Sequence, residues 1–399
     1  MTEASAAAAR LPKRPALAIA AFFALAPGLA VGGAIGLPLI LGLAALAALS
    51  PADIEKMIKN NSLLLSLLAA LVVWLVLSRL WSPWEGETYI KVPVMIALGL
   101  VFSAAAARRE IAPLTLAGAV AALAVLIVML MIEAVGGSPL NRGAAPDATE
   151  YQWTQAPARG AVVMLALVWP ALAWLLSLRA SCRWAAIAVL TLTAGFVSLQ
   201  FGQQSNALGF VLGGAFFLFA LFAPRLAILL PAFGLAAWIA VAPFATLLLF
   251  AGRALPDWLP HSWDVRLGIW LNTSERILQQ PWIGHGLDAG RAVTEMTTYD
   301  GEALAVIPVH PHSAALQIWY DAGVVGAALT AALLALLGLA LARAYASNKL
   351  AAATAAAVLA MFGAMANIGW SPAQEWWLAT MFLAGALVAA TGAATSARG

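Results

Sequence analysis

Histidine and arginine side chains gather in one polar segment of this chain, residues 252–313, between two long apolar runs. The segment contains His261, His285, His310, His312, Arg253, Arg266, Arg276 and Arg291. A neutral imidazole accepts protons near neutral pH because its unperturbed pKa is about 6.5. A guanidinium group binds phosphate or carboxylate through a planar fork of N–H donors. We therefore expect the chemistry of this protein here, above all at His310-Pro311-His312-Ser313.

A metal site at these histidines is disfavoured by their spacing. His310 and His312 are two residues apart, which is wrong for one helix face. No carboxylate or cysteine completes a ligand set with them and His285 at a standard spacing. The single cysteine, Cys182, excludes a thiolate cluster and an intramolecular disulfide. We expect neither a metal nor another cofactor.

The composition is that of a polytopic membrane protein. Apolar residues make up 63% of the chain, charged residues 10%, and the mean hydropathy is +0.91. These values exclude an ordinary soluble domain, whose helices would show polar faces at helical spacing. Apolar stretches of about 17 to 25 residues recur instead, as expected of membrane-spanning helices.

The apolar runs predict about twelve membrane-spanning helices in an all-α fold. They lie near residues 16–31, 33–49, 62–80, 92–107, 111–133, 160–178, 184–201, 207–223, 226–251, 314–342, 350–368 and 376–394. Residues 1–251 then hold nine of these helices, 252–313 form a large, partly helical outer loop with the His/Arg site, and 314–399 hold the last three.

The distribution of basic residues predicts the orientation. With the N-terminus in the cytoplasm, thirteen of the 21 Lys and Arg residues lie on the inner side, which also places the C-terminus inside. The outer eight are Arg79, Lys91, Arg142, Arg159, Arg253, Arg266, Arg276 and Arg291. Seven of these are arginine, which suits phosphate or carboxylate binding; lipid-headgroup contact and surface ion pairing are the alternatives.

Two outer loops are longer than turns. Residues 133–159 are expected to be irregular, with Arg159 at the mouth of the next helix. In the second loop, residues 265–279 are expected to form an amphipathic helix with Ser262 as N-cap, which stops before Pro281. Residues 281–286 are expected to form a turn.

Tryptophan placement leaves two interpretations open. Most of the sixteen tryptophans are expected to anchor the chain at the membrane interface, and five mark outer boundaries: Trp81, Trp84, Trp370, Trp376 and Trp377. Trp263, Trp270 and Trp319 are candidates for stacking on sugar rings, with interface placement as the alternative.

The spacing after His312 resembles a known motif. His312-Ser313 is followed after nine residues by Gly323 and after two more by Gly326, which is similar to the histidine motif of the O-antigen ligases. The stretch 316–323 also resembles the region that these ligases share with polymerases. So does the helix from Arg266 to Trp270 followed by residues 281–286. The resemblance covers residues 260–330 by motif.

The resemblance implies a GT-C-like glycosyltransferase in the bacterial inner membrane. Its expected reaction moves a polysaccharide from undecaprenyl pyrophosphate to a sugar hydroxyl of lipid A-core on the periplasmic face, without nucleotide sugar or metal. The expected partners are that donor, that acceptor and membrane lipids, with no nucleic acid. His312 would be the general base. The substrate-binding candidates are Arg266 and Arg159 for the pyrophosphate, and His310, Arg142 and Arg291.

This chain departs from the family pattern at one point. Members of the family usually carry an arginine just outside the helix that is expected to end near Phe201, where this chain has Gln203-Gln204-Ser205-Asn206. Either Arg159 or Arg142 supplies the missing charge, or pyrophosphate binding differs here.

Other functions stay open at this point. A polymerase that uses a second lipid-linked repeat unit, and a transferase to protein serine, are variants on the same scaffold. A transporter is the non-enzymatic alternative. It would need an acidic residue inside the membrane, and none is expected there apart from Glu133 at a helix end. No inverted repeat is visible either.

Structural roles compete with the chemical ones. His312 could only orient the start of its helix. Gly323 and Gly326 are best interpreted as small residues that permit close helix packing in lipid.

Overall fold

The structure is a computed structural model that describes residues 13–253, 255–256, 259–299 and 302–396. Its elements are α1 (Lys13–Val31), α2 (Leu37–Ala48), α3 (Pro51–Asn60), α4 (Ser62–Ser78), α5 (Thr88–Ala106), α6 (Ala112–Gly136), α7 (Pro139–Ala144), α8 (Glu150–Ser177), α9 (Arg183–Ser198), α10 (Gln204–Phe222), α11 (Pro224–Phe250), α12 (His261–Gln279), the 3₁₀ turn η2 (Ala289–Ala292), β1 (Met296–Tyr299), β2 (Glu302–Ala305), α13 (Ala314–Tyr345), α14 (Lys349–Ile368) and α15 (Glu375–Ser396).

The all-α polytopic membrane fold is confirmed. Within the described ranges, nine helices are long and apolar enough to cross a membrane: α1, α5, α6, α8, α10, α11, α13, α14 and α15. The shorter helices α2, α4 and α9 coincide with the other three apolar runs of the sequence. Helices suit this solvent because they satisfy their backbone hydrogen bonds internally, which lipid cannot do.

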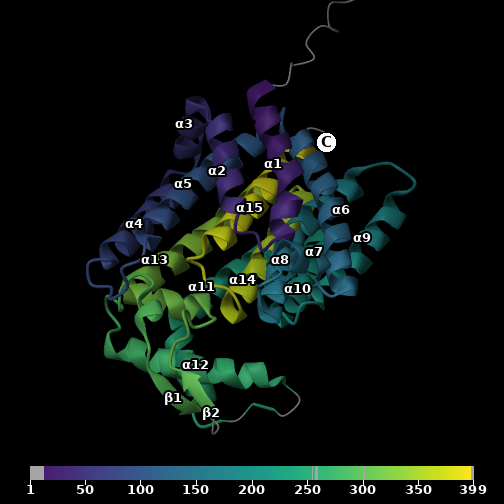
Figure 1. The fold of residues 1–399 in the computed structure, drawn as a ribbon. Coiled ribbons are helices and arrows are strands. Elements are labelled where there is room, and N and C mark those ends of the chain that lie inside the picture. Colours follow the sequence, from purple (N-terminus) through teal and green to yellow (C-terminus); the bar gives the residue numbers. More distant parts are fainter. Residues whose placement is uncertain (1–12, 254, 257–258, 300–301, 397–399) are drawn as a thin grey trace, which may run out of the picture.

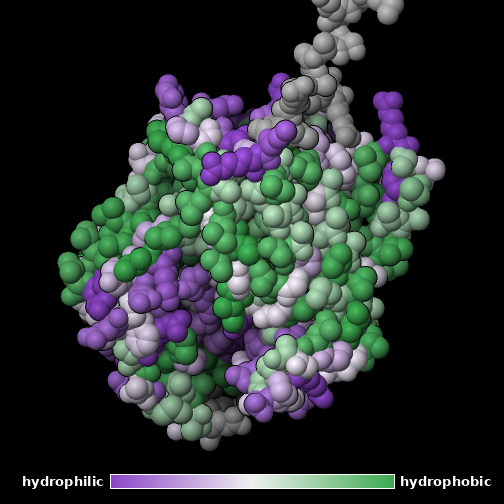
Figure 2. All heavy atoms as spheres, turned by 45° about the horizontal axis from the view of Figure 1, so that its top comes forward, coloured by the Kyte–Doolittle hydropathy of each residue, from purple (hydrophilic) through white to green (hydrophobic). Residues whose placement is uncertain are grey.

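The two ends of the helix bundle differ in character. The start of α1, the helix α3 and the end of α15 lie at one end, whereas α12, β1 and β2 form a layer beyond the other end (Figure 1). Figure 2 shows hydrophobic residues over most of the visible flank, and hydrophilic residues near α3 and around a hollow in the lower half. This distribution is typical of a membrane protein whose loops form a polar domain on one side.

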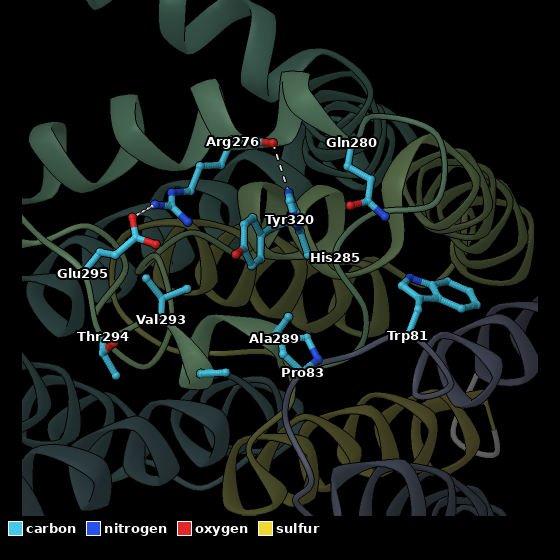
Figure 3. Close-up of a pocket in the computed structure, with 11 residues that line it drawn as sticks. Trp81, Pro83, Arg276, Gln280, His285, Ala289, Val293, Thr294, Glu295 and Tyr320 are labelled. Carbon is cyan, nitrogen blue, oxygen red and sulfur yellow. Dashed lines mark hydrogen bonds and ion pairs between the residues drawn. The ribbon is translucent and has the colours of Figure 1, made fainter.

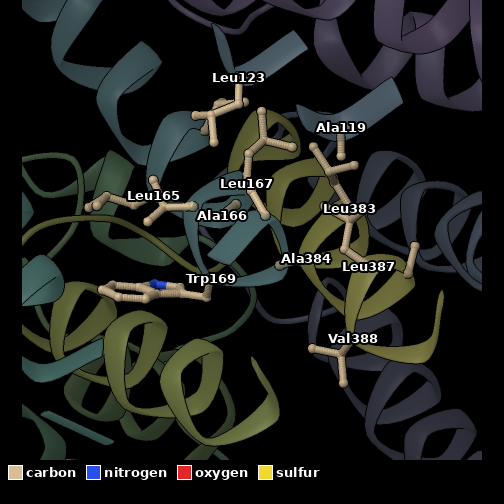
Figure 4. Close-up of a cluster of buried hydrophobic side chains, with 14 of the residues drawn as sticks. Ala119, Leu123, Leu165, Ala166, Leu167, Trp169, Leu383, Ala384, Leu387 and Val388 are labelled. Carbon is tan, nitrogen blue, oxygen red and sulfur yellow. The ribbon is translucent and has the colours of Figure 1, made fainter. Parts of the chain in front are cut away.

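The helix α8 lies at the centre of the bundle. In its most apolar stretch of 18 residues, 78% of the residues are buried. Ala119 and Leu123 of α6 face it from one side, and Leu383 and Leu387 of α15 from another (Figure 4). Only packing and internal hydrogen bonds hold such a core together, because lipid offers no competing polar solvent. The packed α8 therefore provides a fixed support for any side chain near its N-terminal end.

The loop after α11 differs from the expectation in two ways. α12 begins at His261 rather than Val265, and Pro260, in an extended conformation, is its N-cap instead of Ser262. The antiparallel hairpin of β1 and β2 was not expected, because its four-residue strands are too short for a clear alternation of apolar and polar residues.

The loop between α6 and α8 is more regular than expected. It contains α7, and α8 begins at Glu150, so Arg159 lies inside this helix and not at its mouth. A capping box starts α8. The hydroxyl of Thr149 accepts a hydrogen bond from the backbone nitrogen of Gln152, and the side-chain oxygen of Gln152 accepts one from the backbone nitrogen of Thr149. This Thr-x-x-Gln signal was present in the sequence.

The helix α13 is broken at Gly323, whose φ of 61° and ψ of −161° are not helical. The backbone of residues 281–286 lies in the break. The Val324 nitrogen donates to the Pro281 carbonyl at 2.8 Å, and the nitrogens of His285 and Gly286 donate to carbonyls of α13 at 2.6 and 2.9 Å. Gly323 therefore admits a loop into the helix, and its interpretation as a helix-packing residue is wrong.

We expect Gly323→Ala to lower the free energy of unfolding by more than about 2 kcal/mol, because a left-handed φ is costly for alanine. A Cβ there would also collide with the Trp282 carbonyl. Thermal unfolding of the detergent-solubilised protein measures the loss. Gly385→Ala is the control, since a Cβ there meets no atom within 4 Å among the described residues. Equal unfolding temperatures for both variants would contradict the assigned role of Gly323.

Candidate active site

His312 stands at the entrance of α13 with one ring nitrogen already engaged. Its Nδ1 lies 3.0 Å from the carbonyl oxygen of Gly369, an acceptor, so Nδ1 carries the hydrogen. The neutral ring then keeps its lone pair on Nε2. The backbone of His312 has a φ of 53°, which is uncommon outside glycine and marks a constrained position. The geometry thus leaves Nε2 as a proton acceptor.

The amide of Asn367 anchors the segment that carries His312. Its Oδ1 accepts from the Ala315 nitrogen at 3.1 Å and from Trp238 Nε1 at 3.2 Å, and its Nδ2 donates to the Gly363 carbonyl at 2.8 Å. Ser313 caps the same helix by accepting from the Leu316 nitrogen at 3.4 Å. The start of α13 is therefore tied to the end of α14.

His310 contacts both the backbone and the ring of His312. Its Nδ1 accepts a hydrogen bond from the His312 backbone nitrogen at 3.2 Å, and the two rings meet edge to face at 4.5 Å. Burial lowers the pKa of His310 to about 3, with further lowering by the charges of His312 and Arg291. His310 is thus neutral and only 8% exposed, which suits a structural contact more than a substrate contact.

Arg266 of α12 brings positive charge to His312. Burial of the guanidinium lowers its own pKa. Burial also lowers the pKa of His312, and the positive charge of Arg266 lowers it further. The hydrogen bond to the Gly369 carbonyl acts in the opposite direction and raises this pKa. Arg266 Nη1 donates to the Ser262 carbonyl at 2.9 Å. Its buried Nε has no hydrogen-bond partner among the described residues.

Arg159 of α8 is linked to the turn that holds His312 through two tryptophan rings. Its guanidinium lies 5.6 Å from the ring of Trp376, which meets Trp370 edge to face at 4.9 Å. Trp370 directly follows Gly369, the residue that holds His312. In the described part of the chain, the buried Nε of Arg159 also lacks a partner.

The N-terminal end of α10 contacts α8 beside Arg159, and the N-terminal end of α12 contacts α10. Asn206 Nδ2 donates to the Ala158 carbonyl, next to Arg159, at 3.0 Å. Trp263 Nε1 of α12 donates to Gln204 Oε1 at 2.6 Å. Within the described ranges, Ser205 Oγ and Asn206 Oδ1 are buried polar atoms without a partner. Such atoms are costly unless a ligand or water satisfies them, so their presence here indicates a polar ligand site.

Residues 201–331, which include α10 to α12 and the start of α13, match the family model described as O-antigen ligase. This part of the chain, about a third of its length, is similar to the O-antigen ligase family. This match confirms the family resemblance seen in the sequence around His312.

Named relatives agree with this similarity. The chain is 28% identical over 182 residues to a "Putative polysaccharide ligase" of Rickettsia bellii (strain RML369-C), which covers 43% of each chain. It is 37% identical over 68 residues to "Putative polysaccharide ligase RT0347" of Rickettsia typhi (strain ATCC VR-144 / Wilmington), 16% of this chain and 17% of the relative. The matched segments thus span less than half the length of these relatives.

Two of the substrate-binding candidates have other contacts. Arg142 is exposed, and its guanidinium lies 5.0 Å from the Trp153 ring on its own loop. Arg291 is ion-paired with the buried Asp288, Nε to Oδ2 at 2.6 Å. Of the two arginines considered for the missing family charge, Arg159 is thus the one beside residues 203–206.

The tryptophan expectation fails at the turn between α14 and α15. Trp370, Trp376 and Trp377 are buried inside the protein and do not lie at a lipid interface. Trp319 is also buried and donates to the Ile239 carbonyl at 2.6 Å, so it is closed to a sugar ring. The interface rule placed the first three by their position at a helix end, which does not reveal the side on which a neighbouring helix lies.

Acidic residues are more prominent than expected. Asp321 is buried within α13, where Gln317 Nε2 lies 3.4 Å from its Oδ2, so the expectation of no acidic residue within a span is wrong. Glu133 is buried too, and it accepts from the Leu140 nitrogen at 2.6 Å. Both carboxylates therefore hold local structure.

Several site residues were missed by sequence reasoning. Gly369 and Asn367 act on a histidine more than fifty residues away, through a carbonyl and an amide that carry no motif. Ser205 and Asn206 were noted only as the place of a missing charge. The signal that was available is the polar stretch 203–206 at an otherwise apolar helix end.

A pocket lies on the loop side of the protein (Figure 3). It has a volume of about 310 Å³ and is formed by three distant segments: residues 81–83, the stretch from the end of α12 to Glu295, and Tyr320 of α13. His285 stacks on Tyr320 at 4.4 Å with an interplanar angle of 21°. His285, which was considered for a metal site with His310 and His312, lines this pocket, whereas His310 and His312 do not.

We expect Asn367→Ala to reduce the free energy of unfolding by about 2 kcal/mol, because it leaves the Ala315 nitrogen and Trp238 Nε1 without an acceptor. Thermal unfolding in detergent measures this change. Asn61→Ala is the control, since Asn61 is exposed and donates only to the Met57 carbonyl of its own helix turn. An unfolding temperature of Asn367→Ala equal to wild type would contradict the anchoring role.

Proposed function

We propose that this protein is an O-antigen ligase. It transfers a polysaccharide from undecaprenyl pyrophosphate to a sugar hydroxyl of lipid A-core, and it does so without a metal ion. The observation that carries this proposal is that an imidazole able to accept a proton lies near a guanidinium group that has no carboxylate partner among the described residues. His312 has Nδ1 occupied and Nε2 open, and the buried guanidinium of Arg266 is close enough to lower its pKa.

His312 is suited to the role of general base. Its lowered pKa keeps the imidazole neutral at physiological pH, so Nε2 is ready to accept a proton. The Gly369 carbonyl fixes the tautomer and the ring orientation, as the third member of a catalytic triad does. The same contact stabilises the imidazolium that forms during the reaction, because a carbonyl dipole favours a positive ring.

Arg266 and Arg159 are suited to bind the pyrophosphate. Both guanidinium groups are partly buried, and neither is paired with a carboxylate among the described residues. Charges held in a site that excludes water act on a bound anion more strongly than exposed charges do. Trp376 holds the Arg159 guanidinium by its ring face, which leaves the N–H groups available.

The chemical step is a direct displacement at the anomeric carbon. The acceptor hydroxyl oxygen forms the new bond to this carbon while its proton passes to His312 Nε2. The bond from the carbon to the pyrophosphate oxygen breaks, and undecaprenyl pyrophosphate leaves with both electrons of that bond. Arg266 and Arg159 stabilise the charge that develops on the leaving oxygen. Direct displacement inverts the anomeric configuration.

The proposed orientation has both termini in the cytoplasm and the site in the periplasm of a bacterial inner membrane. It is supported by the excess of basic residues in the loops near α3 and the end of α15. α12 and the hairpin, which lie with the site, are at the opposite end of the bundle (Figure 1). Donor and acceptor would both enter from the outer leaflet.

We expect a null strain to lose the O-antigen ladder on lipopolysaccharide gels, and wild-type protein to restore it. His312→Ala should not restore it, because loss of a general base lowers the rate by about 10²- to 10⁴-fold. His261→Ala, an exposed histidine at the start of α12, should restore the ladder. Membrane levels of each variant are compared by immunoblot.

The lipid-linked intermediate distinguishes the alternatives. Accumulation of long unligated polymer in the null strain agrees with a ligase, whereas accumulation of single repeat units identifies a polymerase. A normal ladder in the null strain would refute ligation, and a restoring His312→Ala would show that His312 is only structural.

We expect the acid limb of transfer by the purified protein to have its midpoint below the usual imidazole value of about 6.5, because burial and Arg266 lower the pKa of His312. A lowered pKa means that the base stays neutral at pH values where a free imidazole is half protonated. Initial rates of transfer between pH 4.5 and 8 measure the acid limb. In Arg266→Gln the limb should move to higher pH, since a positive neighbour is removed; an unmoved limb would exclude His312 as the titrating group.

A further inference from the structure

The pocket in Figure 3 lies away from His312 along the same helix. Arg266 approaches His312 from the first half of α12, and Arg276 lines the pocket ten residues farther on, about 15 Å at 1.5 Å per residue. The loop of residues 281–286 and the start of α13 connect the two regions. A molecule that reached both would have to be longer than one sugar unit.

The pocket combines aromatic faces with planar polar groups. Trp81, His285 and Tyr320 provide the aromatic surfaces. Arg276, paired with Glu295, and the amide of Gln280 lie around them, as Figure 3 shows. A pyranose presents C–H groups on its faces and hydroxyl groups at its rim, so it can stack on the former and form hydrogen bonds with the latter.

The walls of the pocket are fixed by the backbone of the protein itself. His285 Nε2 lies 3.0 Å from the Arg276 carbonyl, and Trp81 Nε1 donates to the Gly284 carbonyl at 3.1 Å. These bonds use the ring nitrogens and, with the stacking of His285 on Tyr320, hold the rings that line the pocket in place. A wall that is ordered before the ligand arrives loses little entropy on binding, which favours recognition of a weakly binding neutral ligand.

Two side chains in the pocket have spare hydrogen-bonding capacity. Gln280 and Thr294 line it, and neither side chain has a partner within the described ranges. The volume of about 310 Å³ is at the lower end of the usual range for small-molecule sites, which suits one sugar ring.

We propose that this pocket is a pyranose-binding subsite, which holds a sugar unit of the donor glycan or of the acceptor core that is not the unit undergoing transfer. This rests on the proposed glycosyl transfer. Binding at a remote subsite raises kcat/KM only for substrates long enough to reach it. The subsite therefore gives the protein a preference for extended glycans over a single lipid-linked sugar.

Two variants test the subsite. Thr294→Trp adds a bulky side chain at the edge of the pocket, and Gln280→Ala removes a donor and an acceptor from it. Gln279→Ala is the matched control, because Gln279 is the exposed neighbour of Gln280 and does not line the pocket. Unfolding temperatures are measured for all three, and if Thr294→Trp fails to fold, Gln280→Ala decides.

Kinetics with substrates of different length separate this role from a structural one. Purified wild type and variants are given undecaprenyl pyrophosphate with one sugar or with a long polymer, and lipid A-core with full or truncated outer sugars. We expect the pocket variants to lose kcat/KM about tenfold with extended substrates and to keep wild-type values with short ones. A loss that follows donor length assigns the subsite to the donor glycan, and one that follows the core assigns it to the acceptor.

Equal losses with short and long substrates would overturn the subsite. Failure of wild type to transfer any glycan would instead refute the proposed function, and direct binding then tests the pocket by itself. In saturation-transfer NMR with the soluble repeat-unit oligosaccharide, wild type and Gln279→Ala should give signals that Thr294→Trp lacks. Signals of the same strength in Thr294→Trp would show that the sugar binds elsewhere.

Discussion

The backbone contact between residues 281–286 and the break in α13 at Gly323 is the constraint on which the rest of the loop domain depends. Three backbone hydrogen bonds join the two segments, and they need a residue without a side chain at Gly323. A Cβ at Gly284 would lie 2.6 Å from the Gly323 nitrogen. This contact fixes the end of α12 against the start of α13. It thereby sets where α12 presents Arg266 and where His285 meets Tyr320.

The segment of His312 is likewise fixed by hydrogen bonds to residues far away in the sequence. The imidazole is oriented by a carbonyl of the turn after α14, and the helix that follows it is held by Asn367. Hydrogen-bonding groups of the protein thus orient the His312 ring, whereas in the described part of the chain the buried Nε atoms of Arg159 and Arg266 are left without a partner. Buried polar atoms without a hydrogen-bond partner lower the stability of the folded protein, and a polar substrate that binds to them can offset this loss.

Sequence reasoning was sufficient for the helix plan and for the family resemblance of residues 201–331. Apolar runs located each long helix because lipid requires about twenty apolar residues per crossing, and the spacing from His312 to Gly323 marked the region that the family model covers. It failed for features that depend on contacts between segments far apart in the sequence. Position in the sequence could not show that Trp370 and Trp376 turn inward, or that Gly323 receives a loop. Arg159 was misplaced at a helix mouth although Thr149 and Gln152 signalled the true start.

The hydrogen bond from His312 to Gly369 also has a consequence for biosynthesis. The histidine lies before α13 and its partner lies after α14, so two complete hydrophobic helices must enter the bilayer before the bond can form. Until then the neutral ring has no carbonyl to select its tautomer, and Arg159 has no Trp376 beside it. The His312 imidazole is therefore oriented, and the Arg159 guanidinium is covered, only once α14 and α15 are in place against the rest of the bundle.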